Sequence, residues 1–137
     1  MKTILVLEDD PSNMQGFSAL LSLIGYSVLE ATTGKEAIKA GNCHGPIDLF
    51  LSDVDLPGPS GTEVALEVTK SHPTIPVLFV SGTPMYSWRR NDLDNFKKLP
   101  SDLVGFIEKP CRLSAFVDKV GELIEKRKSS CGMLTQK

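Results

Sequence analysis

Carboxylates follow two separate apolar runs in this chain. Glu8 and Asp9 come directly after Ile4–Leu7, and Asp53 follows Leu49–Leu51 with a single serine between them. If these runs are neighbouring strands, their ends bring the acids together, and two carboxylates about 4 Å apart repel by about 4 kcal/mol at an effective dielectric of roughly 20. A counter-charge is then required. Mg²⁺ is suitable because this hard ion binds one or two carboxylates, keeps several waters and meets phosphate oxygens. The residue types therefore predict an acidic magnesium site.

A hydroxyl and a lysine follow two further apolar runs. Ser81 comes directly after Val77–Val80, and Lys109 follows Leu103–Ile107 with one residue between them. Beside a bound metal ion, Asp53 can act as a nucleophile toward a phosphoryl group and form an aspartyl phosphate. The charge that develops on the transferred group needs a fixed cation, for which Lys109 is the candidate, and Ser81 can donate a hydrogen bond to a phosphoryl oxygen. Together these residues predict phosphoryl-transfer chemistry.

The elements that must hold these side chains alternate between strands and helices. Runs without polar alternation are typical of strands buried on both faces of a parallel sheet. We expect five strands, at residues 4–7, 26–29, 49–51, 77–80 and 103–107. The second is more polar, as an edge strand would be. Between the strands, apolar residues recur at helical spacing, and Asp10, Thr33 and Ser60 are candidate helix N-caps.

This alternation predicts an α/β fold. The expected form is a doubly wound, flavodoxin-like (βα)5 domain, with a five-stranded parallel sheet in the order 2-1-3-4-5 and helices on both faces. The ligand crevice of such a sheet lies at the carboxyl ends of strands 1 and 3, which is where Asp9 and Asp53 fall. Residues 83–102 fit the pattern less well, since they hold two prolines and the one tryptophan of the chain. We expect a short helix and a longer loop there, with residues 88–90 in an exposed, solvated loop.

Length and composition limit the class of protein. With 137 residues, 41% of them hydrophobic, the chain is expected to form one globular domain. Its net charge of -2 argues against a protein that coats nucleic acid or an anionic membrane. Its three cysteines lack Cys-x-x-Cys spacing, which favours reduced thiols and a cytoplasmic location. No apolar run approaches the roughly 20 residues that span a bilayer, and we expect no signal peptide.

The ordered motifs resemble a known family. They are Leu7-Glu8-Asp9-Asp10-Pro11, Asp53 with Leu56-Pro57 and Gly61, Ser81, and Lys109-Pro110. In this order and spacing they are similar to the CheY-like receiver domain of two-component response regulators. Val80-Ser81-Gly82 resembles receivers attached to hybrid sensor kinases. The resemblance covers roughly residues 1–127, so we expect a receiver domain at residues 1–128 and a flexible C-terminal tail at residues 129–137.

The resemblance implies a role for each matching residue at the acidic site. Asp53 is the phospho-acceptor. Asp9 and Asp53 bind Mg²⁺ through their side chains, the backbone carbonyl of Asp55 is a further ligand, and Glu8 binds through a metal-bound water. Glu8 stands where the family usually has aspartate, and its extra methylene is expected to preserve the geometry.

The resemblance also implies a switch. Lys109 pairs with the phosphoryl group, and a cis bond before Pro110 would aim it. Ser81 and Phe106 match the pair in which a hydroxyl moves toward the phosphate and an aromatic ring follows it inward. Phe106 could equally be plain core, and it lacks the hydroxyl that a tyrosine would use to signal its position.

The function that follows is a signalling module rather than a turnover enzyme. A histidine kinase or histidine phosphotransfer protein would phosphorylate Asp53. The output would be a contact with a downstream protein that the sequence does not identify, or onward phosphotransfer. We expect a stand-alone receiver, with a piece of a larger protein as the alternative. Dimerisation through the fourth and fifth helices stays open. No nucleic-acid or membrane partner is expected.

Two other functions are kept as alternatives. The first is a small Mg²⁺-dependent phosphatase or phosphotransferase, because such phosphatases use a second aspartate two positions after the nucleophile as general acid, and Asp55 stands there. The second is a receiver that no longer switches and serves as a binding scaffold.

Overall fold

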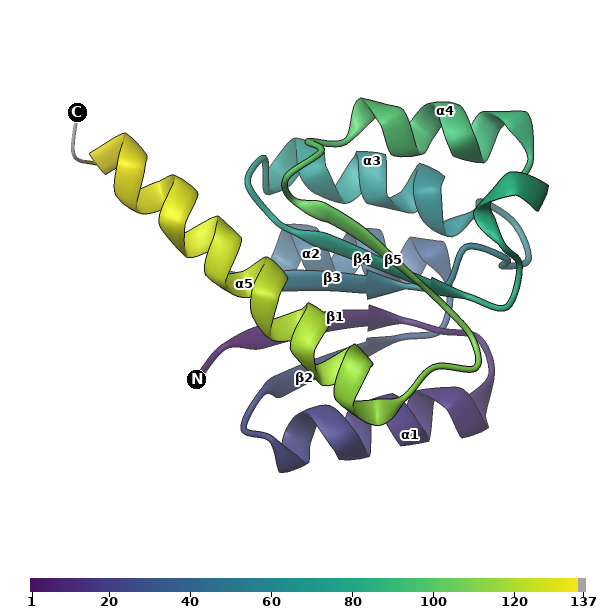
Figure 1. Cartoon of the computed structure of the whole chain (residues 1–137), viewed down its shortest axis with the longest axis horizontal. Helices are drawn as coiled ribbons and strands as arrows, with labels where there is room; N and C mark the ends of the chain where they lie inside the picture. The colour runs from purple at the N-terminus through teal and green to yellow at the C-terminus, as the bar shows by residue number, and fades with distance from the viewer. Residues whose placement is uncertain (136–137) are drawn as a thin grey trace.

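The computed structural model describes residues 1–135, with side-chain surroundings given as far as Arg127. A five-stranded sheet forms its centre, and all four pairs of neighbouring strands are parallel. The sheet order is β2-β1-β3-β4-β5, as predicted (Figure 1). The strands are β1 Thr3–Leu7, β2 Ser27–Ala31, β3 Leu49–Ser52, β4 Val77–Ser81 and β5 Val104–Glu108. The sequence therefore located every strand to within a few residues.

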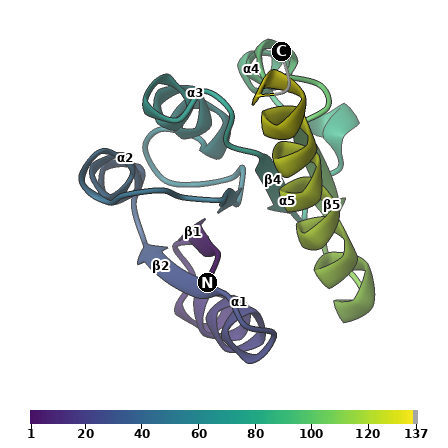
Figure 2. The same ribbon diagram turned by 90° about the vertical axis from the view of Figure 1, so that its left-hand side faces the viewer.

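Five α-helices cover the two faces of this sheet. They are α1 Pro11–Leu23, α2 Gly34–Cys43, α3 Gly61–Ser71, α4 Arg90–Lys98 and α5 Leu113–Thr135. One face packs against α1 and α5, and the other against α2, α3 and α4, so the molecule has three layers (Figure 2). Each inner strand sends alternate side chains to opposite faces. In β4, for example, Phe79 joins the core under α3 and α4, and Leu78 joins the core under α5. Burial on both faces explains the unbroken apolar runs.

Local signals account for where three helices begin. Asp10 accepts a hydrogen bond from the backbone N–H of Ser12 (3.0 Å) at the start of α1. Thr33 and Ser60 accept from the N–H groups of Glu36 (3.1 Å) and Glu63 (3.4 Å), at the starts of α2 and α3. All three predicted N-caps are confirmed. They satisfy backbone donors that a helix otherwise leaves without a partner.

The segment between β4 and β5 contains the predicted short helix but differs from the prediction at Trp88. It contains a short 3₁₀ helix, Met85–Ser87, and the nine-residue helix α4. The expectation that Trp88 lies in an exposed loop was wrong, since only 6% of its surface is exposed. Its ring packs against three phenylalanines of the core, Phe79, Phe96 and Phe106. The charged residues beside Trp88 in the sequence lie at the surface, but the indole has enough apolar area to be drawn inward.

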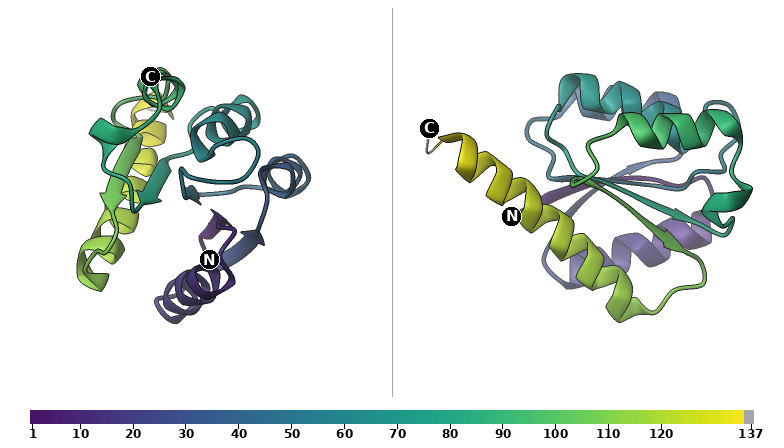
Figure 3. Two further views of the ribbon diagram at one scale, coloured as in Figure 1. Left: turned by 90° about the vertical axis from the view of Figure 1, so that its right-hand side faces the viewer. Right: turned by 45° about the horizontal axis from the view of Figure 1, so that its top comes forward.

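The last helix extends beyond the sheet. Its C-terminal end projects away from the body of the domain (Figure 3, right). The helix passes the expected boundary at residue 128, and residues 136–137 of the expected tail lie outside the described residues. The division into domain and tail stays a prediction. Within residues 1–135, no helix has the length and apolar character needed to cross a membrane.

Candidate functional site

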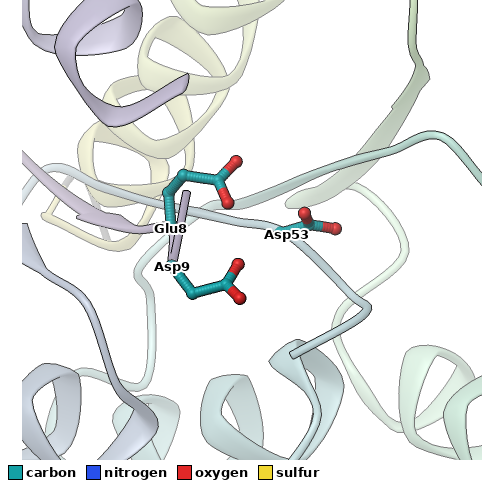
Figure 4. A group of neighbouring side chains, drawn as sticks. All are labelled: Glu8, Asp9 and Asp53. Atoms are coloured by element: carbon teal, nitrogen blue, oxygen red, sulfur yellow. The ribbon is translucent and has the colours of Figure 1, made fainter. Parts of the chain in front are cut away.

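Three carboxylates meet at the carboxyl ends of β1 and β3. These strands pair directly, with Leu7 opposite Ser52, so the residues that follow them are neighbours. Glu8, Asp9 and Asp53 each offer an oxygen, and the three oxygens all lie within 4.8 Å of one another. Figure 4 shows the Glu8 and Asp9 side chains extending from one strand end toward Asp53. The predicted acidic cluster is therefore present.

The three acids differ in exposure. The side chain of Glu8 is 1% exposed, that of Asp53 is 14% exposed, and Asp9 lies at the surface. The cluster therefore opens toward solvent on the side of Asp9 and Asp53 and is closed behind Glu8. An ion or a phosphoryl group can approach only from the open side.

Lys109 supplies the counter-charge to these acids. Its Nζ lies 3.3 Å from Oε1 of Glu8 and 3.4 Å from Oδ2 of Asp53. Its backbone N–H donates to the carbonyl of Ser81 (2.8 Å), and the bond to Pro110 is cis, as the resemblance implied. The ammonium group also lies 6.0 Å from the centre of the Phe17 ring, near enough for a weak cation–π contact. One lysine thus bridges a buried and a half-buried carboxylate.

This arrangement shifts two pKa values. Burial raises the pKa of Glu8 above its usual value, and the nearby Asp53 adds to the effect, although the Asp10 backbone N–H and Lys109 partly oppose it. Burial alone would lower the pKa of Lys109, but the carboxylates of Asp53 and Glu8 together raise it above its ordinary value. Lys109 is therefore a fixed positive charge at neutral pH.

The donor set suits a hard divalent ion. All three candidate side chains present carboxylate oxygens, and no soft sulfur or imidazole ligand belongs to the cluster that the described residues form. Mg²⁺ binds through few carboxylates and retains waters, which the open side of the site accommodates. Asp55 lies on the exposed loop after β3, and its backbone N–H donates to Oδ1 of Asp53 (3.2 Å). Its carbonyl as a metal ligand stays a prediction.

The loop that carries Asp53 is held by a very close backbone approach. The backbone N–H of Gly61 donates to the carbonyl of Val54 (3.1 Å). A Cβ atom added to Gly61 would lie 1.8 Å from the carbonyl oxygen of Asp53. No other residue type fits at this distance, which explains the glycine of the motif.

The hydroxyl of Ser81 lies at the end of β4 and is fully buried. Its Oγ donates to Oδ2 of Asp55 (3.1 Å) and accepts from the backbone N–H of Thr83 (3.1 Å). Oδ2 of Asp55 also accepts from Oγ1 of Thr83 (2.8 Å). The contacts of the Asp55 side chain with Ser81 and Thr83 were not predicted from the sequence. No local signal reports them, because 26 and 28 positions separate the partners.

Phe106 lies on β5 and is half-buried. Its ring packs edge-on against Trp88, with 5.1 Å between centroids and an interplanar angle of 90°. Trp88 in turn donates from Nε1 to the carbonyl of Thr83 (2.9 Å). The two residues of the expected switch pair, Ser81 and Phe106, are thus joined through Thr83 and Trp88, a connection that no sequence pattern indicates.

The comparisons with known proteins agree with this fold. The family profile described as the response regulator receiver domain matches residues 4–121. The chain therefore belongs to the response regulator receiver domain family, a class of signalling domains in two-component systems.

Three relatives illustrate the family. The sensor kinase CckA of Brucella abortus is 35% identical over 127 residues, which are 91% of this chain and 13% of the kinase. The polar-differentiation response regulator DivK of Brucella ovis is 29% identical over 87% of this chain and 93% of its own length. The solved structure of the response regulator protein TrrA of Thermotoga maritima, in complex with Mg²⁺–BeF, has a TM-score of 0.75 at 29% identity, and the match covers 90% of this chain and 99% of that one. The chain thus spans only a small part of the kinase but nearly the whole length of DivK.

Proposed function

We propose that this domain accepts a phosphoryl group on Asp53 from a histidine kinase or a histidine phosphotransfer protein. One observation carries the proposal. Asp53 lies at the open edge of an acidic cluster with Glu8 and Asp9, and Oδ2 of Asp53 is 3.4 Å from Lys109 Nζ. A carboxylate nucleophile, hard oxygen ligands and a fixed cation are the groups that phosphoryl transfer to an aspartate requires.

The residues divide the chemistry among themselves. An oxygen of Asp53 attacks the phosphorus of a phosphohistidine, an O–P bond forms, and the N–P bond breaks with its electron pair returning to the imidazole. Asp9 and Asp53, with Glu8 behind them, would hold Mg²⁺, which supplies charge stabilisation on the transferred group. Lys109, held between Glu8 and Asp53, offsets the negative charge of the transferred phosphoryl group. The Mg²⁺–BeF complex of TrrA supports a site of this kind in a relative.

The proposed output is a shift between two conformations. When Asp53 carries a phosphoryl group, the Ser81 hydroxyl turns toward it and Phe106 follows. The altered face then changes a protein contact.

Intact-mass spectrometry after incubation with Mg²⁺ and acetyl phosphate tests the proposal. The wild-type protein is expected to gain the mass of one phosphoryl group, and Asp53→Asn is expected to gain none. Asp94→Asn, an exposed acid on α4, is the control and should label like the wild type. Equal labelling of wild type and Asp53→Asn would contradict the assignment of Asp53.

A phosphatase with Asp55 as general acid receives less support. Oδ2 of Asp55 accepts hydrogen bonds from two hydroxyls of the domain, Ser81 and Thr83, so these side chains engage this oxygen as an acceptor. Turnover of a small phosphate ester beyond one equivalent per protein would favour the phosphatase over the receiver.

A further inference from the structure

We propose that the side chain of Asp55 restrains the segment Gly82–Trp88 in its resting conformation, through hydrogen bonds that must break when Asp53 is phosphorylated. We call this segment the switch loop. The inference rests on the proposed function, because it concerns how phosphorylation of Asp53 is opposed and read out.

The Ser81 hydroxyl has only one hydrogen to donate. A serine hydroxyl carries one hydrogen and can donate one hydrogen bond. That hydrogen bond goes to Oδ2 of Asp55 (3.1 Å). To donate to a phosphoryl oxygen on Asp53, Ser81 must give up the bond to Asp55. The Asp55 carboxylate therefore competes with the phosphoryl group for the same hydrogen.

The backbone of Thr83 is hydrogen-bonded to the Ser81 hydroxyl. Its N–H donates to Oγ of Ser81 (3.1 Å), so Thr83 is drawn along when Ser81 turns toward Asp53. Its own hydroxyl donates to Asp55 (2.8 Å), whose backbone is held by the hydrogen bond to Asp53. Movement of Thr83 lengthens the contact between its hydroxyl and Asp55. This bond therefore belongs to the resting conformation alone, and an interaction made in only one of two states shifts the equilibrium toward that state.

Trp88 connects the switch loop to the core. The carbonyl of Thr83 accepts from Nε1 of Trp88 (2.9 Å), and the indole packs edge-on against Phe106. Displacement of Thr83 therefore pulls on a buried ring rather than on a free side chain. Because Trp88 is the one tryptophan of the chain, its fluorescence reports on the switch loop directly.

Helix α4, which follows the switch loop, is fixed to the domain by hydrogen bonds. Helix α4 begins at Arg90 and is tied to the start of α3 by the buried Asp92. Oδ1 of Asp92 accepts from Oγ of Ser60 (2.6 Å) and Oγ1 of Thr62 (2.5 Å). Charge-assisted hydrogen bonds of this kind in a buried place hold the two helices together. Between β4 and α4 the backbone change therefore lies within Gly82–Trp88, and α4 stays in place.

The test is a titration with beryllofluoride, a phosphoryl mimic, in excess Mg²⁺, followed by Trp88 emission. Thr83→Val removes the hydroxyl that donates to Asp55 and keeps the size of the side chain and the backbone N–H. Thr83→Ser keeps a hydroxyl and is the matched control. We expect the midpoint for Thr83→Val to lie about three- to tenfold below that of the wild type, because a hydrogen bond to a carboxylate is lost from the resting state alone. Thr83→Ser should titrate like the wild type.

A second pair of variants shows whether Asp55 is the partner. In an Asp55→Ala background the hydroxyl of Thr83 has no carboxylate to meet, so Thr83→Val should no longer change the midpoint. An unchanged or higher midpoint in Thr83→Val, an equal decrease in the Asp55→Ala background, or Trp88 emission that does not respond would each overturn the restraint.

Beryllofluoride-free samples of the same variants are incubated with Mg²⁺ and acetyl phosphate, and their intact masses are measured by mass spectrometry. Failure of the wild type to label would count against the proposed function. Normal labelling together with any of the three contrary outcomes would count against the restraint alone.

Discussion

The carboxylate of Glu8 is the most deeply buried of the three at the site. Its side chain is 1% exposed and faces both a lysine and the carboxylate of Asp53. Burial disfavours the ionised form, and the pKa of Glu8 is accordingly raised from the usual 4.5. A carboxyl with a raised pKa in the folded protein stabilises the fold below the unfolded pKa. That contribution is lost as the pH rises through the folded pKa.

Glu8→Gln is therefore expected to raise the melting temperature of the metal-free protein at pH 7. The advantage should disappear below about pH 4.5, where Glu8 is protonated in both states. Each 1 kcal/mol of added stability corresponds to about 3–5 °C for a domain of this size. Thermal unfolding in a chelating buffer across this pH range measures the effect. A lower melting temperature for Glu8→Gln at neutral pH would mean that the contact with Lys109 outweighs the cost of burial.

Gly61 is the second residue whose type is dictated by its surroundings. Gly61→Ala would force a methyl group against the carbonyl of Asp53, where a Cβ would lie only 1.8 Å away. We expect a loss of about 1–3 kcal/mol in the free energy of unfolding, since the backbone around Asp53 must shift. Gly16, on the exposed side of α1, has nothing within 4 Å of its Cβ position and is the control. Gly16→Ala should stabilise the protein by about 0.5–1 kcal/mol. Urea unfolding of both variants decides the matter, and equal effects would rule out the clash.

At the scale of elements, the contact between α3 and α4 includes a buried polar network beside its apolar packing. Asp92 and Asn95 on α4 are buried, and they meet Ser60 and Thr62 at the start of α3. Buried carboxylates are stable in a fold only when their lone pairs have donors, and here two hydroxyls serve. The network gives α4 one defined position on the domain.

Asp92→Ala is predicted to loosen α4. It removes the acceptor of the buried Thr62 hydroxyl and the half-buried Ser60 hydroxyl, and we expect the free energy of unfolding to fall by about 1–3 kcal/mol. Asp94→Ala changes an acid on the same helix that is exposed and paired weakly with Arg90 (3.8 Å), so it should change stability by at most about 0.5 kcal/mol. Hydrogen exchange of the α4 amides measures local opening of the helix, and chemical unfolding measures global stability. Comparing the two shows whether the loss is confined to α4. Equal exchange in the two variants would argue that α4 is held by its apolar contacts alone.

At the scale of the whole molecule, we expect the acidic site to couple metal binding to stability. The three carboxylates are brought together only when β1 and β3 pair, so a metal ion that needs all three binds the folded state. Folding and Mg²⁺ binding should therefore reinforce each other.

Mg²⁺ is expected to raise the melting temperature in proportion to the logarithm of its concentration. At tenfold above the dissociation constant the gain is about 1.4 kcal/mol, or roughly 4–7 °C. Asp9→Asn should lose most of this response, because it removes a charged oxygen from the open side of the site. Asp118→Asn, an exposed acid on α5, should keep it. A response of the same size in Asp9→Asn and the wild type would show that the stabilising ion binds elsewhere.

The sequence by itself determined the sheet and the acidic site, because both follow from short-range patterns. A buried strand of a parallel sheet is apolar on both faces, so its position can be identified from consecutive residues, and the residue after it must lie at the sheet edge. For this reason Glu8, Asp9, Asp53, Ser81 and Lys109 could be assigned to one edge before any coordinates, and the structure places them there.

The tertiary structure alone decided what surrounds them. Trp88 is buried although two arginines follow it, and Asp92 is buried although it is an acid in a polar helix. Each meets partners from distant segments: the phenylalanines of β4 and β5 for Trp88, and the hydroxyls before and within α3 for Asp92. The contact of Asp55 with Thr83 is of the same kind. A polar or amphipathic side chain can be buried only if another part of the chain supplies a partner for it. A local sequence pattern does not identify that partner.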